Sequence, residues 1–175
     1  MRKNKKRNHQ KHPVPNHKYK DRLFRLVFNN KKDLLDLYNA LNNTCYENPN
    51  DLEVNTLEDA VYLSMKNDIS FLIGGTLNLY EHQSTYNPNM PLRGLIYLAR
   101  LYDGYVETKN INLYSSSLKK LPIPQYFVFY NGTKEQPDET ILQLTDAFES
   151  VSDNRQPCLQ CTAVMLNINY GHNLA

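Results

Sequence analysis

The chain has 175 residues, of which 41% are hydrophobic and 22% charged, an ordinary composition for a globular protein. Its length suits one domain with a single core, and no apolar stretch approaches the roughly 18 residues that cross a bilayer. The residues that follow the basic N-terminus are polar, which excludes a secretory signal. Three cysteines are too few for a disulfide framework, so we expect a cytoplasmic protein without membrane association.

Positive charge is concentrated at the N-terminus. The first twenty residues hold eight lysines and arginines and no acid, which leaves twelve basic and eighteen acidic residues in the rest of the chain. Residues 1–17 have almost nothing to bury and are expected to form a disordered tail, with the folded domain at 18–175. Such a tail is consistent both with an electrostatic anchor on nucleic acid and with a solvated segment of no specific role.

The first half of the folded region is expected to contain two helices and then three strands. Apolar residues recur every three or four positions over 18–28 and again over 34–41, which predicts the two helices. A turn-rich stretch follows. Strands are then expected at Leu57–Met65, Asp68–Ile73 and Thr76–Gln83.

The second half is expected to alternate helices with strands. Pro91 lies near the first turn of the next helix. The buried face of that helix is predicted from its apolar residues, which are Leu92, Leu95, Ile96, Ala99, Tyr102 and Val106. We then expect a strand at Tyr126–Tyr130, a short helix at Thr140–Phe148 and a last strand at Thr162–Tyr170. This order indicates an α/β fold.

The hairpin closed by Gly74 and Gly75 brings two acids together. Both glycines can adopt the positive φ of a two-residue loop, and this loop places Asp68 opposite Glu81 on one face of the sheet. Their Cβ atoms would lie roughly 5 Å apart. Two carboxylates at that distance repel by about 3 kcal/mol at an effective dielectric near 20. A hard divalent ion with oxygen ligands, such as magnesium, relieves this repulsion.

Two further polar residues share the face of Asp68 and Glu81. Gln83 follows Glu81 by two positions, and the same register places Lys66 opposite Gln83. The alternative interpretation is an ordinary solvated sheet face, and the pairing requires that the hairpin contain no bulge.

Five stretches of the chain, taken together and in this order, form a sequence pattern that is more specific than any one of them alone. They are Lys20–Arg25, Lys66–Ile73, Tyr80–Arg93, Phe129–Gly132 and Asn167–Asn173. They resemble the PD-(D/E)XK nuclease superfamily and, more narrowly, the recombination-promoting nuclease/transposase family. The resemblance implies a restriction-endonuclease-like αβββαβ core with a mixed central sheet flanked by helices. Because members of this family usually continue beyond the last strand, it also implies a C-terminally truncated chain.

The resemblance assigns roles to the residues of the hairpin. It implies that Asp68 and Glu81 ligate Mg²⁺, with Mn²⁺ as an alternative. Gln83 stands where the superfamily motif has a lysine that orients the attacking water, and glutamine carries no positive charge. Lys66, across the hairpin, is a candidate to supply that charge.

Four residues outside the hairpin are also candidates for the site. Asp21 matches a family acid that would complete the site, although an ion pair with Arg25 on the helix surface explains it equally well. Arg93, Tyr97 and Arg100 recur at helical spacing on the less apolar side of their helix. They are candidates to contact the DNA backbone, and the alternative is a solvated helix face.

The expected function is that of a magnesium-dependent DNA endonuclease, linked to recombination or mobile elements. The metal would activate a water molecule and polarise the scissile phosphate. Two alternatives remain, a catalytically inactive DNA- or partner-binding remnant of such a nuclease and a transposase acting in strand transfer. DNA is the expected partner, and homodimerisation is left open.

Overall fold

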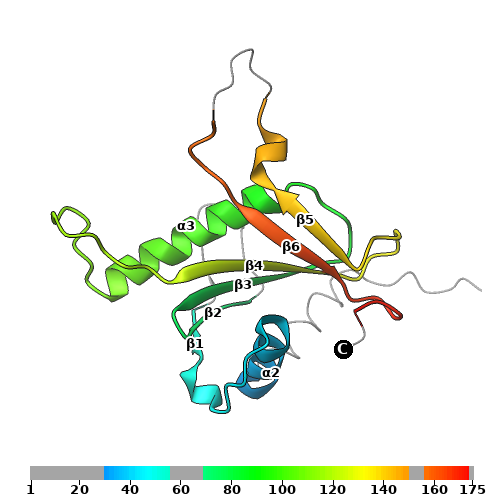
Figure 1. Cartoon of the computed structure of the whole chain (residues 1–175), viewed down its shortest axis with the longest axis horizontal. Helices are drawn as coiled ribbons and strands as arrows, with labels where there is room; N and C mark the ends of the chain where they lie inside the picture. Colours follow the sequence, from blue (N-terminus) through cyan, green and yellow to red (C-terminus); the bar gives the residue numbers. More distant parts are fainter. Residues whose placement is uncertain (1–29, 56–68, 150–155, 174–175) are drawn as a thin grey trace, which may run out of the picture.

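A mixed six-stranded sheet lies between the helices α2 (Lys31–Asn42) and α3 (Met90–Thr108) (Figure 1). The computed structural model describes residues 30–55, 69–149 and 156–173. The strands are β1 (Glu53–Val54), β2 (Ile69–Ile73), β3 (Thr76–Gln83), β4 (Ile123–Tyr130), β5 (Glu139–Gln143) and β6 (Thr162–Asn167). Two 3₁₀ turns complete it, η1 (Pro49–Asp51) and η2 (Leu144–Ala147). The expected α/β class, with a mixed sheet flanked by helices, is confirmed.

The strand order is β1-β2-β3-β4-β6-β5. Strands β3, β4 and β6 are parallel to one another, whereas the β1–β2, β2–β3 and β5–β6 pairs are antiparallel. In the parallel part, Gln83 pairs with Tyr130 and Tyr130 pairs with Asn167. The carboxyl ends of the three strands therefore meet at one edge, which is where open α/β sheets commonly place their binding sites.

The register predicted for the β2–β3 hairpin is confirmed over all its described pairs, from Ile73 opposite Thr76 to Ile69 opposite Tyr80. Gly74 and Gly75 have φ angles of 55° and 81°, as the two-residue loop requires. Gly74 has a second reason to be glycine, because an added Cβ would lie 2.2 Å from the hydroxyl of Tyr46.

Several predictions fall on the N-terminal side of this hairpin. The basic tail, the helix over 18–28, the strand at Leu57–Met65 and the residues Asp68, Lys66 and Asp21 all lie outside the described residues. These predictions stay predictions.

Helix α2 lies where a helix was expected. It begins after Asn30, whose side chain accepts a hydrogen bond from the backbone N–H of Lys32, and it ends at Asn43, which has a φ of 52°. Its apolar side packs on the sheet face of β2 and β3 that points away from α3. The helix contributes Leu34, Leu35 and Tyr38 to this core.

Helix α3 exists as predicted but buries a different face. The residues it buries are Met90, Pro91, Gly94, Tyr97, Leu98 and Leu101. Of the face expected to be buried, Leu92 is 45% exposed and Ala99 is also exposed. The reason is a close approach at Gly94, where an added Cβ would lie 2.2 Å from Cε1 of Tyr126 on β4. Apolar residues surround much of this helix, so their period alone could not choose the side that faces the sheet.

The edge strands were not predicted correctly. Residues 139–143 form β5, paired with β6, where a helix was expected over Thr140–Phe148; only the short turn η2 follows. Strand β1 was not anticipated, and β6 ends at Asn167 rather than at Tyr170. An edge strand forms on the open backbone groups of its neighbour, and local periodicity does not reveal that neighbour. Among the described residues, no helix has the length and apolarity needed to cross a membrane.

The two glycines of α3 provide a matched test of its packing. Gly94→Ala should destabilise the protein by about 1–3 kcal/mol, because the new methyl group displaces the ring of Tyr126. Gly104→Ala meets no atom within 4 Å and should stabilise the helix by about 0.4–1 kcal/mol. Urea unfolding of both variants measures the difference, and equal stabilities would refute the close approach as the cause of the helix orientation.

Candidate functional site

Glu81 is a buried carboxylate on the sheet face covered by α3. Side chains alternate along β3, so Leu77, Leu79 and Glu81 point toward α3, and Leu77 and Leu79 belong to the core that α3 closes. Glu81 is only 2% exposed. A carboxylate withdrawn from water to this extent requires positive charge or hydrogen-bond donors beside it.

Arg93 supplies positive charge from the first turns of α3. Its Nη2 lies 3.2 Å from Oε2 of Glu81, and the same nitrogen donates to the hydroxyl of Tyr97 at 3.3 Å. The side chain of Arg93 is 33% exposed, so the ion pair lies at the boundary between the core and solvent. Burial acts to lower the pKa of Arg93, but the hydrogen bond to Tyr97 and the charge of Glu81 outweigh it and raise that pKa. Arg93 is therefore a permanent cation.

The hydroxyl of Tyr126 adds a second polar group below α3. Tyr126 is 4% exposed, and its hydroxyl has no hydrogen-bond partner among the described residues. Burial, and then the negative charge of Glu81, raise the pKa of Tyr126, so the phenol stays protonated. Glu81 and Tyr126 thus combine a buried charge with an unpaired donor, and such a combination is uncommon in a purely structural core.

Gln83 lies on the same face of β3, at the carboxyl edge of the sheet. Its side chain is half-buried, and its backbone carbonyl accepts a hydrogen bond from the N–H of Asn131 at 3.0 Å. The carboxylate of Glu81 and the amide oxygen of Gln83 are metal ligands of the type that magnesium prefers. The described residues contain no cluster of three histidine, cysteine or acidic side chains that could hold a metal. These oxygen ligands suit the ion, but the described residues alone do not supply a complete set of ligands.

The structure does not place Arg93, Tyr97 and Arg100 on one solvent-facing side of α3, and their expected contact with the DNA backbone stays a prediction. Tyr97 is 2% exposed and Arg93 points to Glu81, because α3 turns this side toward the sheet. Arg100 is half-buried and lines a cavity of about 320 Å³ together with Asn55 and with residues of β1, β2 and α3. Of the three, Arg93 and Tyr97 belong to the surroundings of Glu81, and Arg100 lies two turns away.

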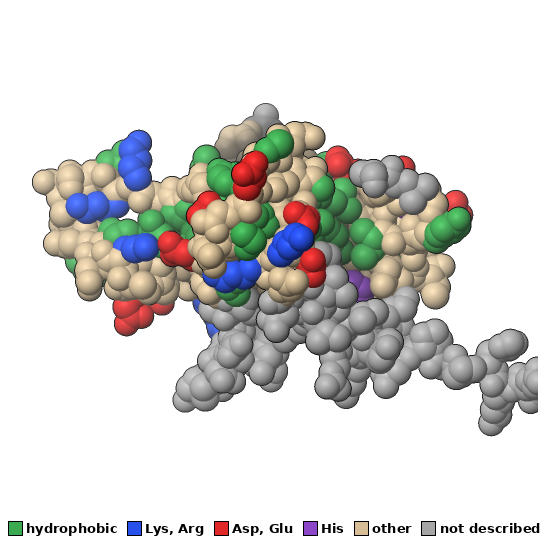
Figure 2. Space-filling model, turned by 90° about the horizontal axis from the view of Figure 1, so that it is seen from below, with side chains coloured by type: hydrophobic (Ala, Val, Ile, Leu, Met, Phe, Trp, Pro, Cys, Tyr) green, Lys and Arg blue, Asp and Glu red, His purple; other side chains and the backbone are tan. Residues whose placement is uncertain are grey.

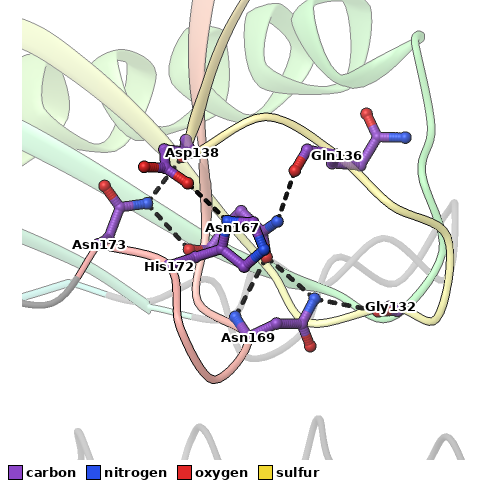
Figure 3. A network of polar contacts seen from close by, with 7 residues as sticks. All are labelled: Gly132, Gln136, Asp138, Asn167, Asn169, His172 and Asn173. Atoms are coloured by element: carbon purple, nitrogen blue, oxygen red, sulfur yellow. Dashed lines mark hydrogen bonds and ion pairs between the residues drawn. The ribbon is translucent and has the colours of Figure 1, made fainter.

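A polar network lies at the same carboxyl edge (Figure 3). Most of its residues belong to the stretches Phe129–Gly132 and Asn167–Asn173, to which the sequence reasoning gave no role of their own. Asn167, 1% exposed, donates to the backbone carbonyl of Gln136 at 2.7 Å. Its side-chain oxygen accepts two hydrogen bonds from Asn169, which itself donates to the carbonyl of Gly132. These contacts, which we call the asparagine clasp, tie the segment after β6 to the loop that follows β4.

The clasp also orients a histidine. Asn173 donates to the backbone carbonyls of Asp138 and Asn167, and the Nδ1 of His172 lies 2.5 Å from Oδ1 of Asp138. Both side chains are partly exposed, with His172 at 32% and Asp138 at 66%. A carboxylate on one ring nitrogen sets the orientation of the imidazole. In the sequence, these contacts are foreshadowed only by the stretch Asn167–Asn173, in which three asparagines are closely spaced.

Comparisons of the chain with protein-family models, with curated proteins and with solved structures find no match.

The ion pair below α3 can be tested by a double-mutant cycle. Arg93→Met should destabilise the protein by about 3 kcal/mol, because it removes the guanidinium that lies 3.2 Å from the buried carboxylate of Glu81. Glu81→Gln should cost less, since the partly exposed guanidinium can turn to solvent. The double variant should be more stable than Arg93→Met alone, with a coupling of about 1–3 kcal/mol in urea unfolding. Strict additivity would contradict the pair.

The asparagine clasp is expected to contribute to stability as well. Asn167→Ala should cost about 2–3 kcal/mol, because it leaves the carbonyl of Gln136 and the N–H of Asn169 unpaired. Asn112→Ala, which removes one hydrogen bond at an exposed position, is the control and should cost under about 0.5 kcal/mol. Thermal unfolding of the two variants would contradict the clasp if their melting temperatures fell equally.

Proposed function

We propose that the protein is a divalent-metal-dependent endonuclease of the PD-(D/E)XK kind, which hydrolyses phosphodiester bonds in DNA. The observation that supports it best is the β2–β3 hairpin. Its described register runs without a bulge from the glycine loop to Ile69 opposite Tyr80. The proposal requires the register to continue by one pair, with Asp68 opposite Glu81.

The order of elements gives further support. The hairpin β2–β3 is followed by the helix α3 and by β4, which pairs parallel to β3. A strand, strand, helix, strand order with this pairing agrees with the corresponding part of an αβββαβ core. The remaining helix and strand of that core would come from residues before β2.

The chemistry would use residues of both sheet and helix. A magnesium ion held by Asp68 and Glu81 would polarise the scissile phosphate and lower the pKa of a bound water. The amide of Gln83 would orient the attacking water by hydrogen bonding, and Lys66 would supply the positive charge that glutamine lacks. Arg93 lies 3.2 Å from the carboxylate of Glu81, and its partly exposed guanidinium would add positive charge near a phosphate bound there.

One observation favours the catalytically inactive remnant as a second candidate. Arg93 already neutralises Glu81, and Gln83 carries no charge. A protein that binds DNA without cleaving it would retain such an ion pair as a structural element.

Plasmid nicking distinguishes the two candidates. Wild-type protein should nick supercoiled DNA with Mg²⁺ or Mn²⁺ and not with EDTA. Asp68→Ala and Glu81→Gln should lower the rate by about 100-fold or more, as expected for the loss of several kcal/mol of charge stabilisation. Glu139→Gln, at an exposed carboxylate on β5, is the control and should cleave normally. DNA binding without nicking under any metal condition would establish the inactive remnant.

Metal binding has a readout that does not depend on cleavage. Magnesium at a hundred times its dissociation constant should stabilise wild type by about 2.7 kcal/mol in urea unfolding. The Asp68→Ala and Glu81→Gln variants should gain far less, whereas Glu139→Gln should gain as much as wild type. Equal gains in all four proteins would refute the metal site.

A further inference from the structure

Residues 109–122 form the loop that connects α3 to β4. Several large apolar side chains of this loop are unusually exposed to solvent. The loop projects from one end of the sheet, at the left of Figure 1. Leu113 is 63% exposed, Tyr114 100% and Leu118 85%. Large side chains are rarely this exposed in such close succession, and a patch of this kind commonly marks an interaction site.

The exposure belongs to an anchored loop. At its start, Asn110 has a φ of 51° and the N–H of Ile111 donates to the carbonyl of Val106 in α3. At its end, the hydroxyl of Tyr102 donates to the carbonyl of Pro122 at 2.7 Å. Between these anchors lies an open hollow of about 480 Å³, lined by Leu113, Ser115, Ser116, Ser117, Leu118, Lys119 and Leu121. The loop therefore presents three leucines, Leu113, Leu118 and Leu121, on a concave surface, with the fully exposed Tyr114 beside them in the chain.

The loop is also positively charged. Residues 109–122 contain three lysines and no acid. Lys109 lies 3.8 Å from Glu53, whereas Lys119 and Lys120 have no carboxylate partner among the described residues. Figure 2 shows lysine and arginine side chains around hydrophobic ones at the same end of the molecule. An occupant of this surface must combine negative charge with flat or apolar groups.

We propose that the 109–122 loop binds a strand of nucleic acid. Lys119 and Lys120 would contact phosphates, while Tyr114 and Leu118 would stack on bases or wedge between them. This inference rests on the proposed function, to which it adds a second contact with the substrate.

The composition of the loop favours nucleic acid over other occupants. Three serines at 115–117 and two asparagines, Asn110 and Asn112, lie among the apolar residues. In a bilayer these polar side chains would lose their hydration without replacement, whereas bases, sugars and phosphates can hydrogen-bond to them. A second copy of the loop would bring like charges together, which disfavours self-association through this surface.

Helix α3 connects the loop with the surroundings of Glu81. Arg93 lies near its first turn, and the loop begins after Thr108, its last residue. The 19 residues of α3 span about 28 Å at a rise of 1.5 Å per residue. At about 3.4 Å per nucleotide of a strand, this length corresponds to roughly eight nucleotides. One short piece of DNA could therefore contact both ends of the helix.

The test is fluorescence anisotropy with labelled duplex and single-stranded oligonucleotides of 20 nucleotides, in EDTA so that no cleavage occurs. The Lys119→Gln/Lys120→Gln variant should lower the slope of log affinity against log salt by about 1.8 on duplex, because two phosphate contacts are lost. Tyr114→Ser and Leu118→Ser should weaken binding by about tenfold with little change in slope. Matched controls at exposed positions elsewhere, Lys134→Gln and Ile141→Ser, should bind as wild type.

The possible outcomes separate this inference from the proposed function. Loop variants that bind DNA with wild-type affinity and slope, or a wild type that binds no DNA, overturn the inference. If anionic phosphatidylglycerol vesicles bind wild type and only this binding is lost in Leu118→Ser, the loop is a membrane contact and the inference is wrong. If the loop variants weaken DNA binding but wild type does not nick DNA in magnesium, the proposed nuclease activity is refuted and the proposed DNA contact of the loop is supported. If wild type nicks DNA and the loop variants bind DNA as wild type does, only the proposed DNA contact of the loop is refuted.

Discussion

The burial of the Glu81 carboxylate constrains how α3 lies on the sheet. A charge that is 2% exposed requires an opposite charge within reach, and Arg93 provides it from the helix. Arg93 reaches Glu81 only if the side of α3 that carries Arg93 and Tyr97 faces the sheet. Gly94 permits this orientation, since the ring of Tyr126 lies where a Cβ would be. The polar pair and the glycine, rather than the apolar period of the helix, decide its rotation.

The backbone around Gln83 is held in place at the carboxyl edge of the parallel strands. Glu81 is buried, and Gln83, two residues further along β3, reaches the carboxyl edge of the parallel strands. There the backbone of Gln83 bonds to Asn131, and the loop that follows is held by Asn167 and Asn169. The asparagine clasp therefore stiffens the backbone beside Gln83. In the proposed nuclease Gln83 would position a water molecule, and it would benefit from such a fixed support.

Much of the hairpin that carries the candidate site was predictable, because its determinants are local. Two adjacent glycines select a two-residue loop, the loop sets the register, and the register assigns every side chain to a face. The pairing of Ile69 with Tyr80 confirms this reasoning as far as the described residues extend. The pairing of Glu81 with Arg93 on α3 was not predictable in the same way. From the polarity pattern of its own helix, Arg93 was expected on the side away from the sheet, and local sequence does not show which strand residue it meets.

The sequence by itself determined the α/β class, the positions of α2, β2, β3, β4 and α3, and the register of the hairpin, since each depends on turn residues or on periodicity within one segment. Only the tertiary structure decided which face of α3 is buried, that residues 139–143 pair with β6 as a strand, and that Asn167 clasps two loops. These features depend on contacts between segments far apart in the chain. A buried charge selects its counter-ion, and an open sheet edge selects its next strand, only when the elements meet in space.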